Sequence, residues 1–229
     1  MLVQAIKTRV FKENEDLEAF IAEHIPTVSD GTILAVTSKI IALSEGRTAA
    51  TEDREKIIEA ESEFMLRTKY TWLTIKDGTV MASAGVDESN ADGKLVLLPK
   101  DSFAAADILR AKLLQRYNLK NLGILVTDSR ILPLRAGVVG VALGYAGLKG
   151  IRDYRGTKDI FGRKMQYSQT DVADGLATAA VLEMGEGAEQ QPLAVIENAP
   201  VEFVESVDRN ELHIDIEDDL YKPLFDTLK

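Results

Sequence analysis

The chain has 229 residues, of which 45% are hydrophobic and 28% charged, and these values fit a globular protein with one large domain or two small ones. It contains no cysteine, which excludes a disulfide framework, a thiolate zinc site and a cysteine nucleophile. The formal net charge of −10 argues against a nucleic-acid-binding protein, because contacts to phosphates favour a basic face.

No segment of the sequence predicts insertion into a membrane. The N-terminal residues lack a long apolar core behind a basic stretch, so they do not predict a signal peptide. No run approaches the roughly 18 apolar residues that span a bilayer. We therefore expect a cytoplasmic protein that has neither a membrane nor a nucleic acid as its partner.

The charge is unevenly distributed along the chain. Residues 130–164 contain eight cations and two acids, whereas residues 183–219 contain twelve acids and one cation. A local basic patch on an acidic protein indicates a small anionic ligand. The alternative, in which the two segments simply face each other across the fold, stays open.

The first half of the chain is predicted to consist mostly of strands. Asp30-Gly31 is a turn signal before an apolar run, and Lys76-Asp77-Gly78 is a hairpin signal between two further runs. In chain order, we expect a strand at Val3–Val10, a helix at Asp16–Ile25, a strand at Thr32–Val36, a charged helix-prone stretch at Asp53–Arg67, a hairpin of Tyr70–Ile75 with Thr79–Ala82, and a strand at Lys94–Leu98.

Two helices are clear in the second half. Apolar residues recur at spacings of three and four within Asp101–Tyr117, and Asp101 or Ser102 can cap its start. The alanine-rich stretch Thr170–Met184 is the second helix, with Thr170 as its candidate cap. We also expect strands at Leu122–Val126, Leu193–Ile196 and Val201–Val204, and a C-terminal segment, Leu220–Leu228, that docks on the body through Tyr221, Leu224 and Phe225.

Strands outnumber helices and do not alternate with them regularly. This pattern predicts an α+β or mixed α/β fold with mostly antiparallel sheets and flanking helices. No linker is visible, so residues 1–229 are expected to form a single unit. A smaller subdomain around residues 50–100 or within about 145–195 stays open.

The segment Gly85-Val86-Asp87-Glu88-Ser89-Asn90 follows a predicted strand and precedes a turn. Asp87 can bind a hard cation, and Asn90 can form a hydrogen bond to a phosphate or a sugar. An Asx-type turn, in which both side chains serve their own backbone, explains the same residues. On spacing alone, the turn is the favoured interpretation.

A second acidic residue, Asp128, follows the apolar strand Leu122–Val126 together with Ser129. A carboxylate beside a hydroxyl at a strand end is a common arrangement for holding Mg²⁺ near phosphates. Arg130 and Arg135 would then neutralise phosphate or carboxylate charge through their bidentate guanidinium groups. The alternative is a surface turn with solvated arginines.

The five glycines between Gly137 and Gly150 form neither a P-loop nor a dinucleotide-binding fingerprint, and they favour close packing or close approach of the backbone. The stretch Asp153-Tyr154-Arg155-Gly156 is either a substrate-facing loop or a charged surface hairpin. Glu186 follows the natural helix stop Gly185 and is a candidate metal ligand, with an ordinary helix-end acid as the default. His24 and His213 are interpreted as structural.

Taken together, these segments resemble the coenzyme F420 gamma-glutamyl ligase family over most of the chain. No single segment is specific, but their order and spacing are. The matching segments are Glu15-Asp16-Leu17, Thr37-Ser38-Lys39-Ile40, Ser44-Glu45-Gly46-Arg47, Gly85-Val86-Asp87-Glu88-Ser89-Asn90, Asp128-Ser129 with Pro133 and Arg135, Gly144-Tyr145-Ala146-Gly147, Asp153-Tyr154-Arg155-Gly156 with Asp159 and Gly162, and Met184-Gly185-Glu186.

The resemblance implies a ligase that uses GTP and Mg²⁺ or Mn²⁺ to add L-glutamate to an anionic deazaflavin acceptor through an acyl phosphate. It further implies an unusual mixed α/β fold in intertwined homodimers. By resemblance, the metal ligands are Asp87, Asp128, Ser129 and Glu186. The nucleotide contacts are Arg9, Val10, Phe11, Ser38, Lys39, Asn90, Met184, Gly185 and Gly187. The catalytic cations, taken from the basic segment 130–164, are Arg135 and Arg155.

Three departures from the family pattern bear on the substrate. Leu43 stands where the family usually has a lysine, residues 128–135 differ from the usual Asp-Thr-Phe-Gly-Arg-Pro-Trp-Arg, and Glu197-Asn198 replaces a frequent Arg-Gly. A nucleotide- and metal-binding regulatory protein without catalysis is therefore the alternative function. A third hypothesis is an interaction protein that uses the acidic segment 183–219 as its surface.

Overall fold

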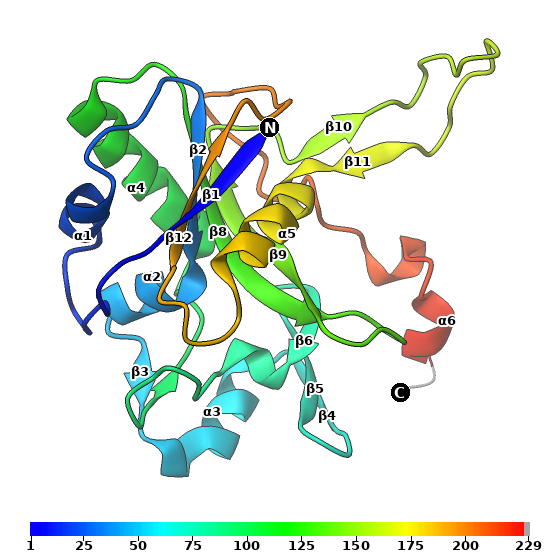
Figure 1. Ribbon diagram of the computed structural model, residues 1–229. Helices are drawn as coiled ribbons and strands as arrows, with labels where there is room; N and C mark the ends of the chain where they lie inside the picture. The colour runs from blue at the N-terminus through cyan, green and yellow to red at the C-terminus, as the bar shows by residue number, and fades with distance from the viewer. Residues whose placement is uncertain (227–229) are drawn as a thin grey trace.

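The computed structural model describes residues 1–226 and is built around one five-stranded sheet (Figure 1). Its strand order is β1-β12-β2-β8-β9. The strands are β1 (Leu2–Ile6), β2 (Thr32–Thr37), β8 (Leu122–Ile131), β9 (Val138–Ala146) and β12 (Leu193–Glu197). Only the β2–β8 pair is parallel, and the other neighbours are antiparallel. Strands β1, β2 and β8 consequently run in the same direction and end at the same edge of the sheet.

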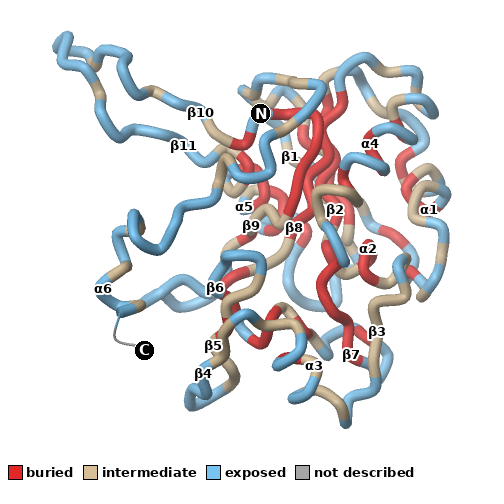
Figure 2. The backbone as a smooth tube through the Cα atoms, turned by 180° about the vertical axis from the view of Figure 1, so that it is seen from behind, coloured by how far each residue is buried: buried red, intermediate tan, exposed pale blue. Residues whose placement is uncertain are grey.

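Helices cover both faces of this sheet. One face packs against α1 (Leu17–His24), α2 (Ser38–Ser44) and α4 (Ser102–Tyr117), and the other packs against α5 (Val172–Met184). Strand β2 shows the period-two pattern that this layering requires. Its Leu34 and Val36 enter the cluster beneath α4, whereas Ile33 and Ala35 enter the cluster beneath α5. The buried tube in Figure 2 follows these central strands.

Residues 48–98 form a separate layer at one end of the main sheet. They contain β3 (Thr48–Ala49), η1 (Thr51–Asp53), α3 (Arg54–Glu61), β4 (Phe64–Arg67), β5 (Trp72–Lys76), β6 (Thr79–Ala82), η2 (Ser83–Gly85) and β7 (Leu95–Val96). Strand β3 pairs with β7, and β4, β5 and β6 form a three-stranded antiparallel sheet. This layer has its own apolar cluster around Ile58, Val86 and Leu95. It presents the Asp87 loop toward the edge where β2 and β8 end.

Two segments extend away from the core. The hairpin of β10 (Ile151–Asp153) and β11 (Gln169–Asp171) projects from the body, and Figure 2 shows it exposed along most of its length. The C-terminal segment runs back along the molecule through η3 (Ile216–Asp218) and α6 (Lys222–Phe225). Both segments carry large apolar side chains on their surfaces.

The structure confirms the predicted mixed α/β class with mostly antiparallel sheets. Both clear helices are present, and Asp101 caps α4 by accepting a hydrogen bond from the Ala104 amide at 2.8 Å. The cap of α5 is Asp171 rather than Thr170, because Thr170 lies in β11. None of the helices within residues 1–226 has the length and apolar character that a bilayer crossing requires.

Four local predictions are corrected. The first strand ends at Ile6 rather than Val10. The helix predicted within residues 53–67 ends at Glu61, and the apolar residues Phe64, Met65 and Leu66 then begin β4. No strand forms at residues 201–204, where Phe203 makes only an isolated bridge to Leu148. Of the C-terminal residues expected to dock, Tyr221 and Leu224 are mainly exposed and Phe225 is half-buried, and residues 227 and 228 lie outside the described residues.

Tyr145 anchors the C-terminal segment to the core. Its fully buried hydroxyl donates a 2.6 Å hydrogen bond to Glu211, which also accepts from the Gly150 amide at 2.7 Å. Burial and the Glu211 carboxylate together raise the pKa of Tyr145 well above its ordinary value. The hydroxyl therefore stays protonated and acts as a donor at neutral pH.

We expect Tyr145→Phe to lower the free energy of unfolding by about 2 kcal/mol, because a buried hydrogen bond to a charged group is lost. Urea denaturation measures this change. Tyr167→Phe is the matched control. The Tyr167 side chain is exposed on the hairpin, so loss of its hydroxyl should leave the free energy of unfolding unchanged. Equal stability of the two variants would show that Glu211 does not hold this segment.

Candidate functional site

Most of the predicted site residues lie at the edge where β1, β2 and β8 end. Arg9–Phe11 follows β1, and Ser38 and Lys39 begin α2 directly after β2. Strand β12 starts at the same edge, so the residues before it, 184–190, also lie there. The Thr8 amide, for example, donates a 2.9 Å hydrogen bond to the Gln190 carbonyl. Crevices beyond the carboxyl ends of parallel strands are the usual binding sites of α/β sheets.

Asp87 lies in this region and is fixed by three donors. Its carboxylate accepts hydrogen bonds from the Ser89 amide at 2.8 Å, the Ser89 hydroxyl at 2.6 Å and the Lys39 ammonium at 2.7 Å. Burial raises the pKa of Asp87, but Lys39 and Ser89 outweigh that effect and hold the pKa below its ordinary value. The Asx-type turn is thus present at Asp87 but not at Asn90, whose side chain bonds Gly187, and the Asp87 carboxylate also forms an ion pair with Lys39 from another element.

Asp128 lies inside β8 rather than after it, which corrects the expected strand end at Val126. The ladder between β8 and β9 has an irregularity between Val126 and Thr127, and the strand then continues to Ile131. The extra residue of this irregularity is Leu143 on β9, so the bend falls on β9, and β8 carries Asp128 as a paired strand residue. The Asp128 carboxylate forms an ion pair with Arg130, and the Ser129 hydroxyl donates a 3.2 Å hydrogen bond to Glu186.

Glu186 lies close enough to both Asp87 and Asp128 for their charges to affect its pKa. Burial raises its pKa, and the negative charges of Asp128 and Asp87 raise it further, against the hydrogen bond from Ser129 and the charge of Lys39. Next to it, the Asn90 side-chain amide donates a 3.1 Å hydrogen bond to the Gly187 carbonyl. The fold therefore brings residues 87–90, 128–129 and 184–187 together, although they are far apart in the sequence.

The donor types in this region fit a hard divalent cation. Carboxylate and hydroxyl oxygens from Asp87, Asp128, Ser129 and Glu186 are the ligands that Mg²⁺ and Mn²⁺ prefer. Within residues 1–226, however, no three acidic or histidine side chains are gathered closely enough to hold a metal ion as they stand. Lys39 and Arg130 instead pair with the two aspartates. A metal would have to displace these cations to complete its ligand set.

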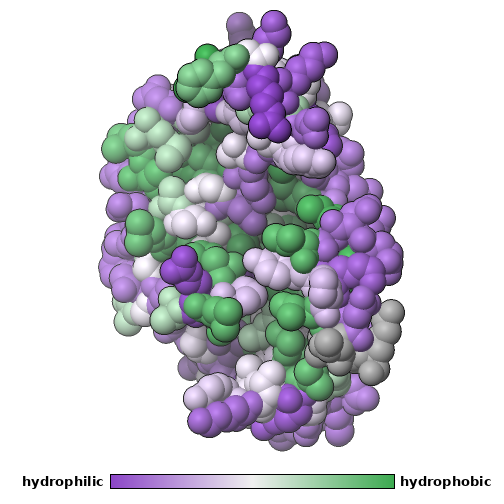
Figure 3. Space-filling view, turned by 90° about the vertical axis from the view of Figure 1, so that its right-hand side faces the viewer, coloured by the Kyte–Doolittle hydropathy of each residue, from purple (hydrophilic) through white to green (hydrophobic). Residues whose placement is uncertain are grey.

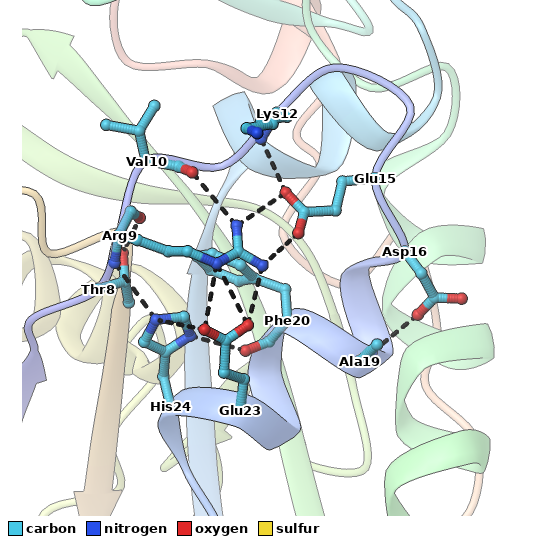
Figure 4. Close-up of polar contacts among 10 residues, drawn as sticks. All are labelled: Thr8, Arg9, Val10, Lys12, Glu15, Asp16, Ala19, Phe20, Glu23 and His24. Carbon is cyan, nitrogen blue, oxygen red and sulfur yellow. Dashed lines mark hydrogen bonds and ion pairs between the residues drawn. The ribbon is translucent and has the colours of Figure 1, made fainter.

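The loop after β1 is held by an ion-pair network around Arg9 (Figure 4). The guanidinium binds Glu15 and Glu23, with 2.8 Å to one Glu23 oxygen, and lies 4.9 Å from the Phe20 ring centroid. These bonds lower the pKa of both glutamates. The Arg9 amide donates to the His24 ring, which supports a structural role for that histidine. Arg9 therefore fixes the loop with its side chain, and a ligand here would meet the backbone.

Comparison with known proteins identifies the family. A model described as F420-0:Gamma-glutamyl ligase matches residues 54–198. The chain belongs to this family. It is 33% identical to a coenzyme F420:L-glutamate ligase of Archaeoglobus fulgidus over 82% of this chain and 83% of the relative. It is 32% identical to a ligase of the same name from Methanococcus maripaludis, over 96% of this chain and 90% of the relative. It is 30% identical to another from Methanocaldococcus jannaschii, over 88% of this chain and 89% of the relative.

The two predicted catalytic arginines lie in different parts of the fold, one on the turn between β8 and β9 and the other on the β10–β11 hairpin. Arg135 lies exposed in the turn between β8 and β9. Arg155 lies on the β10–β11 hairpin and forms an ion pair with Asp153 at 2.6 Å. The hairpin leaves the sheet after the end of β9, which is the edge opposite Asp128. A single chain therefore does not bring Arg155 to the acidic residues.

The basic segment 130–164 follows the second interpretation of its charge only in part. Lys149 forms an ion pair with Glu202, and Arg152 donates to the Pro200 carbonyl, so part of the segment does face residues 183–219. Arg130 is buried against Asp128. Sequence reasoning missed this pairing because it ended the strand at Val126. The signal that could have found it is that Asp128 and Arg130 are two positions apart, which places their side chains on the same face of a strand.

Proposed function

We propose that this chain is a GTP- and metal-dependent ligase that forms an amide between L-glutamate and a carboxylate of coenzyme F420 or its precursor F420-0. The printed names of the relatives and of the matching family support the glutamate and F420 parts of this proposal. The observation that carries it is the convergence of Asp87, Asp128 and Glu186 with Lys39 at the edge where β1, β2 and β8 end.

The proposed reaction begins with transfer of the γ-phosphoryl group of GTP to a carboxylate oxygen of the acceptor. The amine of glutamate then attacks the carbonyl carbon of the resulting acyl phosphate, and inorganic phosphate leaves. Asp87, Asp128, Ser129 and Glu186 would hold Mg²⁺ or Mn²⁺, which neutralises phosphate charge when bound. Lys39 would move from Asp87 to a phosphate oxygen, because its partly exposed ammonium also has partners in Ser89 and can exchange one of them.

The nucleotide would lie across the three loops at this edge. Arg9, Val10 and Phe11 offer backbone groups on a loop that the Glu15 and Glu23 ion pairs hold in place. Ser38 and Lys39 stand at the start of α2, directly after β2, and would contact the nucleotide from there. Asn90 and the Met184–Gly187 turn, already joined by a hydrogen bond, would close the site from the other side.

We further propose that the protein acts as a homodimer. Figure 3 faces the side of the molecule that carries the hairpin and the C-terminal segment, and apolar surface gathers in the middle of it. Exposed contiguous apolar surface of this kind indicates a protein interface. In a dimer the hairpin of one protomer would reach its partner, which gives Arg155 a route to a site that its own chain does not offer. Large exposed apolar residues on these two segments include Ile160, Phe161, Tyr167, Leu220 and Leu224.

The direct test is turnover. The purified chain is incubated with GTP, Mn²⁺ or Mg²⁺, L-glutamate and F420-0, and the acceptor is analysed by mass spectrometry for an added glutamate. We expect a product only when all four components are present, with release of inorganic phosphate. Replacing GTP by ATP tests the nucleotide, and omission of glutamate is the control for simple hydrolysis.

The alternative of a regulatory protein is favoured by the ion pairs that Lys39 and Arg130 make with the two aspartates. It predicts metal-dependent nucleotide binding without product across a panel of carboxylate acceptors. Absence of any nucleotide binding would instead support an interaction protein. The cytoplasmic location stays a prediction.

A further inference from the structure

Arg130 is the most deeply buried charged side chain near the predicted metal ligands. The residue is 7% exposed and lies on β8 two positions after Asp128, so the two side chains share a face of the strand. Its Nη1 atom bonds the Asp128 carboxylate and the Ser129 carbonyl, the latter at 3.0 Å. Its Nη2 atom lies 3.6 Å from the sulfur of Met81.

The guanidinium is incompletely satisfied in this position. Its Nε atom is buried and has no hydrogen-bond partner, and the thioether beside Nη2 is only a weak acceptor. Leaving a buried donor unpaired is unfavourable, particularly on a charged group. Arg130 therefore has a hydrogen-bond donor left over for an anion. Its carboxylate partner, Asp128, is a residue that the proposed function assigns to the metal.

We propose that Arg130 is a positioning residue that occupies the Asp128 carboxylate until the metal and the nucleotide arrive together, and then transfers to a phosphate oxygen. This inference rests on the proposed function. A guanidinium and a divalent cation compete for the same carboxylate, so Arg130 lowers the affinity for metal alone. A phosphate oxygen offers the guanidinium a new partner, which removes that competition and couples the two binding events.

Lys39 and Arg130 differ in how easily each can leave its aspartate when the metal binds. Lys39 has a second set of partners in Ser89 and a partly exposed side chain, so it can leave Asp87 without losing all its hydrogen bonds. Arg130 is enclosed and cannot reach water as readily. The coupling between metal and nucleotide should accordingly depend on Arg130.

The test measures Mn²⁺ binding by electron paramagnetic resonance, with and without a non-hydrolysable GTP analogue. The parent should bind Mn²⁺ weakly alone and more tightly with the analogue. Arg130→Met should bind Mn²⁺ alone at least about tenfold more tightly, which corresponds to about 1.4 kcal/mol, because the competing charge is gone. The analogue should then add little. An unchanged Mn²⁺ affinity and an unchanged effect of the analogue in Arg130→Met would overturn the proposal.

Arg54→Met is the matched control. Arg54 pairs with Glu88 beside Asp87, so this variant makes the same change in charge close to the site without touching Asp128. A similar gain in Mn²⁺ affinity in both variants would indicate a general effect of charge and contradict the role of Arg130. If Arg130→Met does not fold, Arg130→Gln decides: it removes the positive charge but keeps a polar side chain, and retention of the parent's weak Mn²⁺ binding and full coupling would contradict the proposal.

The two proposals fail in distinguishable ways. If the parent binds neither Mn²⁺ nor the nucleotide analogue, the proposed function and the role of Arg130 are both wrong. If the parent binds both and makes product while Arg130→Met behaves like the parent, only the role of Arg130 is wrong.

Discussion

Asp87→Asn and Asp128→Asn are each expected to remove the stabilisation that GTP and Mn²⁺ together give the protein. At a ligand concentration about 100 times the dissociation constant, the parent should gain about 2.7 kcal/mol. Asn keeps the size of the side chain but supplies only a neutral oxygen to a hard cation. Mutation of a residue that only hydrogen-bonds a metal ligand typically lowers metal affinity or activity about 10–100-fold. Loss of the ligand itself should therefore lower kcat/KM by at least about a hundredfold. Thermal denaturation with each nucleotide and metal, followed by the ligase assay, measures both effects.

Glu88→Gln is the control for these two variants. Glu88 is adjacent to Asp87 in sequence, but its carboxylate pairs with Arg54 rather than with Lys39. This variant should keep the full response to GTP and Mn²⁺. If Asp87→Asn and Asp128→Asn also keep it, the carboxylates that converge at this edge do not bind the metal, and the proposed site is wrong.

Local sequence signals predicted the elements whose stability is mainly local. The helix α4 combines a capping aspartate with apolar residues on one face, and both signals act within a few residues. Strand β8 is different, because its second half is not apolar. Residues 127–131 are held in the sheet by pairing with β9, which no pattern within the strand itself indicates. Polar strand residues of this kind need their partner strand to be known.

In the candidate site, too, some features follow from local sequence and others from pairing between distant segments. Asp87 and Asp128 were identified from strand-end positions and from the order of motifs, although either one alone reads as a turn residue. Their proximity depends on the parallel pairing of β2 with β8, which joins residues some ninety positions apart. The placement of Arg155 on the opposite edge depends on the path of β9 and the hairpin. Such placements follow from topology rather than from spacing.

Gly140→Ala is expected to destabilise the protein by about 3 kcal/mol, the upper part of the range for overpacking a well-packed core. A Cβ atom at Gly140 would lie 2.3 Å from the Ala177 carbonyl oxygen and 2.8 Å from Cβ of Val181, so backbone of α5 would have to move. The Thr178 hydroxyl also donates a 2.7 Å hydrogen bond to the Gly140 carbonyl, which keeps α5 close to β9. Urea denaturation measures the loss. Because α5 ends at the Met184–Gly187 turn, the same displacement should weaken nucleotide binding.

Gly175→Ala, on the same helix, separates close packing from a general effect of replacing glycine. No atom lies within 4 Å of a Cβ at Gly175, and the residue is exposed in the interior of α5. Alanine should stabilise it by about 0.5–1 kcal/mol, because glycine loses more backbone entropy in a helix. The two variants should therefore change stability in opposite directions. If Gly140→Ala is as stable as the parent, α5 does not pack directly on β9, and the position of Glu186 at the end of that helix would have to be revised.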